Sequence, residues 1–393
     1  MNSGAQSVIE TNSFWTAELA RKTFFFISVY ITSFLTFFRE SQSVKDDIFV
    51  HIKMVSQVVN GELKIPHVGF QYTVYYINKL FHLSFNIAAF MLLALAFTFL
   101  AYIIFRLLKH FLEVSTSIGI LSTTCLLLVS ALYIPWFNKY IFLGQGSPNV
   151  WHNPTLIMVK PFAFLVTYLS ILALDSKKLK HWVLVSILLL LSMAYKPSFG
   201  VVFIPAFFYF IVINHTKELT VYIKAGLAVF PSCLYALYQY YVMSYQFNNN
   251  PEQGAIQLSV FGVLHLFTHN VFISLLLATA FPLSLMLFRF KQFVSNKYLQ
   301  LILIMFVIAY AQMGLLAETG RHFGDCNFFW GYLIVLQLLF VFSFIEFVKW
   351  VKTAKSQNIL VKSEIGLVSI IFALHLFSGI YYFSRIVLLN NFR

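Results

Sequence analysis

The chain has 393 residues, of which 60% are hydrophobic and only 10% are charged, and its mean hydropathy is +0.79. Soluble globular domains carry about 25% charged residues, so this composition excludes that class and predicts an all-α, polytopic membrane protein. The formal net charge of +13 comes from short basic clusters between apolar runs, a pattern typical of membrane topology signals, so we expect a lipid bilayer and no nucleic acid as partner.

Apolar runs of about the length that crosses a bilayer recur along the whole chain. They predict about eleven transmembrane helices in a single domain of residues 1–393, with no separate soluble domain. The first run is followed by an acidic stretch rather than a small-residue cleavage site, so we expect it to be a retained helix. The predicted spans are 23–38, 85–108, 115–136, 155–174, 182–195, 199–214, 220–243, 263–289, 298–316, 328–348 and 365–385.

The distribution of Lys and Arg sets the predicted orientation. Short basic loops such as DSKKLKH and RFKQFVSNK lie on one side of the spans, and the positive-inside rule places them in the cytoplasm together with the N-terminus. Segments rich in Gly, Pro, Asn, His and carboxylates then all fall on the external side. This asymmetry indicates that the external face carries the function.

The first external loop, residues 39–84, contains two adjacent carboxylates, Asp46 and Asp47. His51 follows Asp47 by four residues, so the two share a face if the segment is helical. A stripe of valines after them predicts an amphipathic helix at the membrane surface, and His67 follows at a turn back toward the membrane. A carboxylate beside an imidazole at the lipid–water boundary suits a general base. The alternative is a pair of solvated loop carboxylates beside an ordinary surface histidine.

A second polar segment is LGQGSPNVWHNPT, residues 143–155. It precedes the fourth span, whose N-terminus would favour an anion such as a phosphate. Trp151 could face a sugar ring, while His152 and Asn153 supply hydrogen-bond donors; a capped loop with an interfacial tryptophan is the alternative. Lys160 falls inside the span, where a lysine usually faces a cavity or else extends to the interface.

Two further segments carry candidate substrate-binding residues. Lys196, in YKPSF, lies between two closely spaced spans and either pairs with a phosphate or anchors the membrane edge. Glu318, Arg321, His322 and Asn327 crowd into AETGRHFGDCNFFWG. The planar guanidinium of Arg321 suits a phosphate, and a structural ion pair is the alternative.

The sequence leaves metal binding open. His265 and His269 have ligand-like spacing on the predicted eighth span, but no motif such as HExxH accompanies them, so we predict no metal site there. Asp46, Asp47 and Glu318 could hold a divalent cation such as Mg or Mn, because hard cations prefer carboxylate oxygens. No cofactor is predicted beyond that possible cation.

The external segments together resemble the GT-C superfamily of integral membrane glycosyltransferases. DIFVHIKMVSQVVNGELKIPH is similar to the D-x3-H…G…PH pattern of a bacterial branch of that superfamily, and GQGSPNVWHNPT and ETGRHFGDCNFFWG are similar to its later blocks. The resemblance covers most of the chain in order and topology. It implies that Asp47, with Asp46 as second candidate, deprotonates or orients the acceptor hydroxyl, and that His51 tunes or shares this role.

The resemblance implies an inverting transferase that moves a sugar from a polyprenyl-phosphate donor to a cell-surface glycan or glycolipid acceptor. We expect it in the bacterial inner (cytoplasmic) membrane with its active face external, where lipid-linked donors replace nucleotide sugars. Arg321, Lys196 and His152 would hold the departing phosphate. The alternatives are an O-antigen or polysaccharide polymerase or ligase, a lipid or polysaccharide transporter (flippase), and a non-catalytic assembly partner. External arginines are too few to favour the first, and no pseudo-symmetric halves favour the second.

Overall fold

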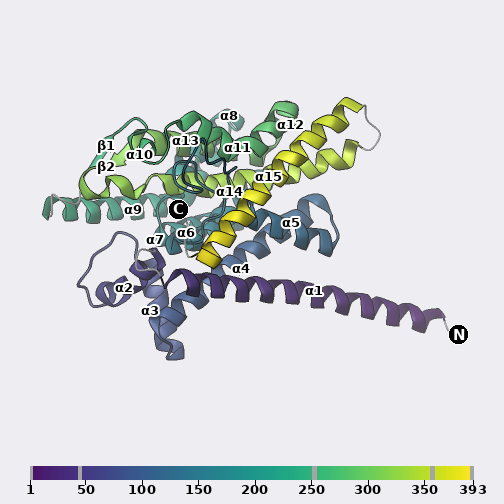
Figure 1. The fold of residues 1–393 in the computed structure, drawn as a ribbon, viewed down its shortest axis with the longest axis horizontal. Coiled ribbons are helices and arrows are strands. Elements are labelled where there is room, and N and C mark those ends of the chain that lie inside the picture. Colours follow the sequence, from purple (N-terminus) through teal and green to yellow (C-terminus); the bar gives the residue numbers. More distant parts are fainter. Residues whose placement is uncertain (1–2, 43–46, 250–254, 355–358, 390–393) are drawn as a thin grey trace.

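The computed structural model describes residues 3–42, 47–249, 255–354 and 359–389; for residues 3–15, 245–249 and 321 it describes the backbone alone. These residues form fifteen α-helices, a short 3-10 helix and one pair of strands (Figure 1). The α-helices are α1 (Ser3–Glu40), α2 (Asp47–Val59), α3 (Gly69–Phe81), α4 (Phe85–Leu112), α5 (Thr116–Leu128), α6 (Pro154–Ser176), α7 (Leu179–Tyr195), α8 (Gly200–Asn214), α9 (Leu219–Asn249), α10 (Gly262–His265), α11 (Val271–Phe288), α12 (Phe290–Ser295), α13 (Lys297–Leu315), α14 (Phe329–Thr353) and α15 (Ile359–Leu389). The other elements are β1 (Ile256–Leu258), β2 (Leu316–Glu318) and the 3-10 helix η2 (Gly320–Asp325).

Seven helices in the described part of the chain are long and apolar enough to cross a membrane: α4, α6, α9, α11, α13, α14 and α15. The chain is therefore a multi-pass membrane protein built as a helical bundle. Helices α5, α7 and α8 are apolar but shorter, with 13, 17 and 15 residues. The predicted total of eleven spans stays a prediction.

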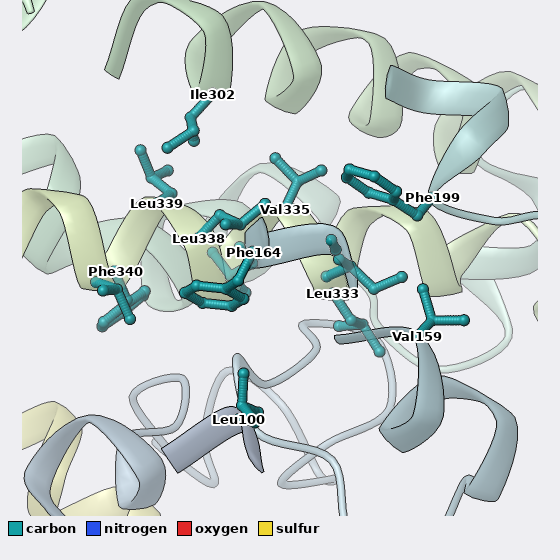
Figure 2. Close-up of a cluster of buried hydrophobic side chains, with 14 of the residues drawn as sticks. Leu100, Val159, Phe164, Phe199, Ile302, Leu333, Val335, Leu338, Leu339 and Phe340 are labelled. Carbon is teal, nitrogen blue, oxygen red and sulfur yellow. The ribbon is translucent and has the colours of Figure 1, made fainter. Parts of the chain in front are cut away.

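Helix α14 is the centre of the bundle. It packs against α4, α6, α11 and α13, and nearly all of its side chains are buried. Figure 2 shows Leu333, Leu338 and Phe340 of α14 in one cluster with Phe164 of α6 and Leu100 of α4. A helix that is apolar all round is expected at the core of a membrane bundle. Few side chains of α9 and α15 are buried, so these two helices lie at the periphery.

The two ends of the bundle differ in chemistry. Helix α2 and the two strands lie at the left of Figure 1, whereas α12 and the beginning of α1 lie toward the right. At the α12 end, Lys177 pairs with Glu218 at 2.8 Å and Lys297 pairs with Asp175, which ties the end of α6 and the α6–α7 connection to the α8–α9 connection and to the start of α13. The opposite end collects α2, α3, the start of α6, the α7–α8 connection and the strands. The polar segments thus gather at one end of the molecule.

The predicted span at 115–136 is wrong in its second half, because α5 ends at Leu128. The chain continues as an irregular segment that packs on α15. There Ser130 N–H donates to the His375 carbonyl (3.1 Å), and the His375 ring is hydrogen-bonded to the Ser130 carbonyl (2.7 Å). Gly379 permits this approach, since a Cβ there would lie 1.7 Å from the Leu128 oxygen. Non-helical backbone inside an apolar bundle is stable only when protein groups satisfy its hydrogen bonds in this way.

The end of α5 is also held by two buried amides that the sequence did not single out. Asn149 Nδ2 donates to the carbonyl oxygens of Leu126 (3.0 Å) and Val129 (2.8 Å). Gln337 of α14 donates to Asn149 Oδ1 at 2.7 Å and is itself fully buried. These bonds replace the helical partners that the last carbonyls of α5 lack.

Two other predictions need correction. The span expected at 263–289 divides into α10 and α11, with Asn270 capping α11 through a 3.0 Å bond from Ile273 N–H. His265 therefore ends α10 while His269 lies in the connection, so they do not share a helix face. The all-α prediction is consistent with the helical bundle; one short antiparallel pair, β1–β2, was not predicted, and in it Ile256 is opposite Glu318. This pair fixes the chain just before η2.

Candidate functional site

The segment between α1 and α4, predicted as the first external loop, contains the predicted amphipathic helix. Helix α2 begins at Asp47, which is partly buried, and His51 follows one turn later on the same helix. Gly61, with φ of +77°, lies just beyond the end of α2, where glycine adopts the left-handed region without strain. Asp46 lies outside the described residues. The buried face of α2 consists of Ile48, Ile52, Val55 and Val58.

A continuous set of hydrogen bonds, here named the Asp47–Lys196 network, runs from α2 across the start of α6 to the end of α7. Asn153 Nδ2 donates to Asp47 Oδ2 at 2.8 Å. Asn153 Oδ1 accepts from Leu156 N–H (2.9 Å), which caps α6, and from the Thr155 hydroxyl (3.0 Å). Lys196 Nζ in turn donates to Thr155 Oγ1 at 3.2 Å. A carboxylate and an ammonium are thus connected through two neutral side chains.

Lys196 is the buried cation of this site. It directly follows α7, in extended conformation before Pro197, and its side chain is only 7% exposed. Its Nζ lies 4.8 Å from the centre of the Trp330 ring, a cation–π contact that replaces part of its lost hydration. Burial lowers the pKa of Lys196 to about 8, while the carboxylates of Asp47 and Glu318 act in the opposite direction. The sequence did not single out Trp330.

Three histidines lie near the network: His152 is buried, and His51 and His67 are half-buried. Burial lowers the pKa of His51 to about 4, that of His67 to about 3 and that of His152 to about 4. The nearby Lys196 ammonium lowers the pKa of His51 and His67 further, whereas Asp47 raises that of His51 and His152. All three rings are therefore neutral at pH 7. They can donate or accept hydrogen bonds, but they do not add positive charge.

A cleft of about 360 Å³ opens beside Lys196, bounded by α9, α13, α14, β1 and the α7–α8 connection. Its polar side is lined by His67, Lys196, Glu318, His322 and Asn327. Its apolar side is lined by Pro197, Val201, Ala236, Tyr240, Met243 and Phe328. The cleft thus unites predicted binding residues from three separate sequence segments. Asp47 and His51 do not line it, but both interact electrostatically with Lys196, and His51 also interacts with His67; Lys196 and His67 do line the cleft.

Glu318 is the carboxyl group of the cleft. Asn327 Nδ2 donates to Glu318 Oε2 at 2.8 Å, and burial raises the pKa of Glu318. His322, also in the cleft lining, is hydrogen-bonded to the carboxylate of Asp325 on η2. The side chain of Arg321 lies outside the described residues, so its predicted role in phosphate binding stays a prediction.

Two predicted binding residues, Trp151 and Lys160, lie buried outside the cleft. The Trp151 indole is buried, with its ring centre 4.4 Å from that of Phe97 and 4.8 Å from that of Phe383. Lys160 is 1% exposed, and its Nζ donates to the Pro148 carbonyl at 2.8 Å rather than lining the cleft. Both residues hold the 143–155 segment in place: the Trp151 ring packs against aromatic side chains, and the Lys160 ammonium donates to a backbone carbonyl.

The described residues contain no group of three His, Cys, Asp or Glu side chains arranged to hold a metal ion. Asp47 and Glu318 both lie close to the Lys196 ammonium, and Asp47 Oδ2 already accepts from Asn153. The possible divalent cation therefore finds no ready ligand set among these side chains.

No protein-family model and no curated protein matches the chain. Its function has to be read from the chemistry of the cleft and the Asp47–Lys196 network.

Proposed function

We propose that this protein is an integral membrane glycosyltransferase of the GT-C superfamily. It transfers a sugar from a polyprenyl-phosphate donor to a cell-surface glycan or glycolipid acceptor on the external face of a bacterial inner membrane. One observation carries the proposal: the cleft joins an apolar side to a polar side with a buried lysine, and a hydrogen-bonded path links that lysine to the first-loop carboxylate. A lipid phosphate matches such a cleft, since it has one charged group and one apolar tail.

Asp47 is the proton acceptor in the proposed reaction. One of its carboxylate oxygens is held by Asn153, which leaves the other to take the proton of the acceptor hydroxyl. The acceptor oxygen then bonds to the anomeric carbon of the donor sugar. The bond from that carbon to the phosphate oxygen breaks, its electron pair stays on the phosphate, and attack from the opposite face inverts the configuration.

Lys196 stabilises the leaving group. The donor phosphodiester carries one negative charge, and the departing polyprenyl phosphate carries a second as its bond to the sugar breaks. A buried ammonium that faces this oxygen stabilises the transition state more than the ground state, because charge develops next to it. Asn327 and neutral His67 supply further hydrogen bonds from the same side of the cleft.

The proposal is tested with polyprenyl phosphate itself, the product shared by all donors of this class. We expect it to bind the purified protein in nanodiscs and Lys196→Met to weaken binding at least tenfold, whereas Lys180→Met, an exposed lysine of the opposite end, does not. Asp47→Asn should then abolish sugar transfer in membranes of producing cells without affecting that binding, with exposed Glu62→Gln as control.

Two results would contradict the proposal. Equal polyprenyl phosphate binding in the Lys196→Met and Lys180→Met proteins would show that the cleft does not bind the lipid phosphate. Full transfer by Asp47→Asn would remove the assigned base. Movement of the lipid across a liposome membrane, without any sugar transfer, would instead favour the transporter.

A further inference from the structure

A fully buried glutamine, Gln71 of α3, contacts the first-loop histidine. Its Nε2 lies 3.1 Å from His51 Nδ1, which joins α3 to α2. Among the described residues, Gln71 Oε1 has no hydrogen-bond partner. A buried amide with an unsatisfied oxygen is costly, and an apolar side chain would fill the same volume without that cost. The contact with His51 is therefore the interaction that can explain why a glutamine is buried at this position.

The chemistry of the two groups sets the position of the ring proton. An amide nitrogen can only donate, so His51 Nδ1 must accept. A neutral imidazole carries its single ring proton on the other nitrogen, which places it on Nε2. The ring is also held by Phe70, whose plane meets it edge-on with centres 6.0 Å apart. Neighbouring residues on α3 thus fix both the orientation and the tautomer of a residue on α2.

We propose that Gln71 is a positioning residue that holds His51 as the Nε2–H tautomer, so that His51 donates a hydrogen bond to a substrate oxygen and does not act as the base. The identity of that oxygen, on the acceptor or on the phosphate, rests on the proposed glycosyltransferase function. The tautomer itself does not depend on it. Gln71 thereby joins the site although it lies outside the cleft.

The surroundings of His51 agree with this division of roles. Three charged or titratable groups face it: Asp47 one turn earlier on α2, and Lys196 and His67 from the cleft side. Lys196 disfavours a second proton on the ring, and Asp47 is the anionic group able to take one from an alcohol. With Nδ1 occupied by Gln71, Nε2 is the ring nitrogen left to bind a ligand.

The test is nitrogen NMR of the full-length protein in nanodiscs, with labelled histidine. His51→Gln identifies the His51 signals by their loss. We expect the wild-type ring at pH 7 to show a protonated Nε2 and an unprotonated Nδ1. Gln71→Leu should remove this bias, and Gln71→Glu should reverse it, because a carboxylate accepts from Nδ1–H. A role in packing alone would not reverse the tautomer.

Gln337→Leu is the matched control, because it also removes a fully buried amide but lies far along the chain on α14. It should leave the His51 signals unchanged. Protonated Nδ1 in the wild-type protein, or unchanged signals in both Gln71 variants, would overturn the proposal. With transfer established, Gln71→Leu should lower kcat about tenfold with a smaller change in KM. If no sugar is transferred but the tautomer is as expected, the proposed function fails and the positioning role stands.

Discussion

Asn153 performs two tasks that one substitution can separate. Its Oδ1 accepts from Leu156 N–H and caps α6, while its Nδ2 donates to Asp47 Oδ2 at 2.8 Å. Serine caps helices about as well as asparagine. Its side chain is too short to cap the helix and also reach Asp47. Asn153→Ser should therefore keep α6 intact and release the carboxylate.

The expected size of the effect follows from this geometry. A hydrogen bond to a charged group contributes about 1.5–3 kcal/mol, and each 1.36 kcal/mol is a factor of about ten in rate. We expect kcat for sugar transfer to fall about 10- to 100-fold, because the base is no longer oriented. KM for the donor should change little, since Asp47 does not line the cleft. Stability should change by only a few tenths of a kcal/mol, because the cap is retained.

The assay combines transfer kinetics in nanodiscs with thermal unfolding of the same preparations. Asn270→Ser is the control, because Asn270 caps α11 with the same geometry (3.0 Å to Ile273 N–H) and binds no carboxylate among the described residues. It should leave both kcat and Tm unchanged. Equal kcat in the Asn153 and Asn270 variants would refute the reasoning, as would a loss of activity that merely follows a loss of stability.

Two further predictions concern stability. His51, His67 and His152 take up protons only near pH 3 to 4 in the folded protein but near pH 6.5 in the unfolded chain, so the free energy of unfolding should fall as the pH drops from about 6.5 to 4. His67→Gln should make the Tm less dependent on pH in that window, and an unchanged slope would contradict the assignment. Gly379→Ala should destabilise by about 1–3 kcal/mol, because its Cβ would meet the Leu128 backbone at 1.7 Å. Gly366→Ala on the same helix meets nothing within 4 Å and should stabilise by up to about 1 kcal/mol, so equal Tm shifts would contradict the packing account.

The sequence predicted the features that depend on composition and local periodicity. The apolar runs predicted the multi-pass helical bundle. The spacing of the valines and of the Asp47–His51 pair predicted the surface helix that is α2. The grouping of the polar segments could be predicted because successive spans cross the membrane in opposite directions, so every second connection lies at the same end of the bundle. This predicted that Lys196 and Glu318 lie at the same end of the bundle, and both line the cleft.

What could not be predicted depends on contacts between distant segments. The end of α5 at Leu128 is fixed by Asn149, His375 and Gly379, and none of these lies in the apolar run itself. Trp151 has the same local sequence whether it stacks on a sugar or on Phe97. Only the packing of α4 and α15 against it decides between these outcomes.

The separation of charges in the site argues for a catalytic arrangement over a purely structural one. A direct Asp47–Lys196 ion pair would neutralise both groups and leave neither for a substrate. Asn153 and Thr155 instead stand between them, so the carboxylate keeps an oxygen for a proton and the ammonium keeps donors for a phosphate. Among the described side chains, Lys196 is the one lysine or arginine lining the cleft, and His67 is neutral there. One fixed positive charge matches a donor phosphodiester, and its effect grows as the leaving phosphate gains its second negative charge.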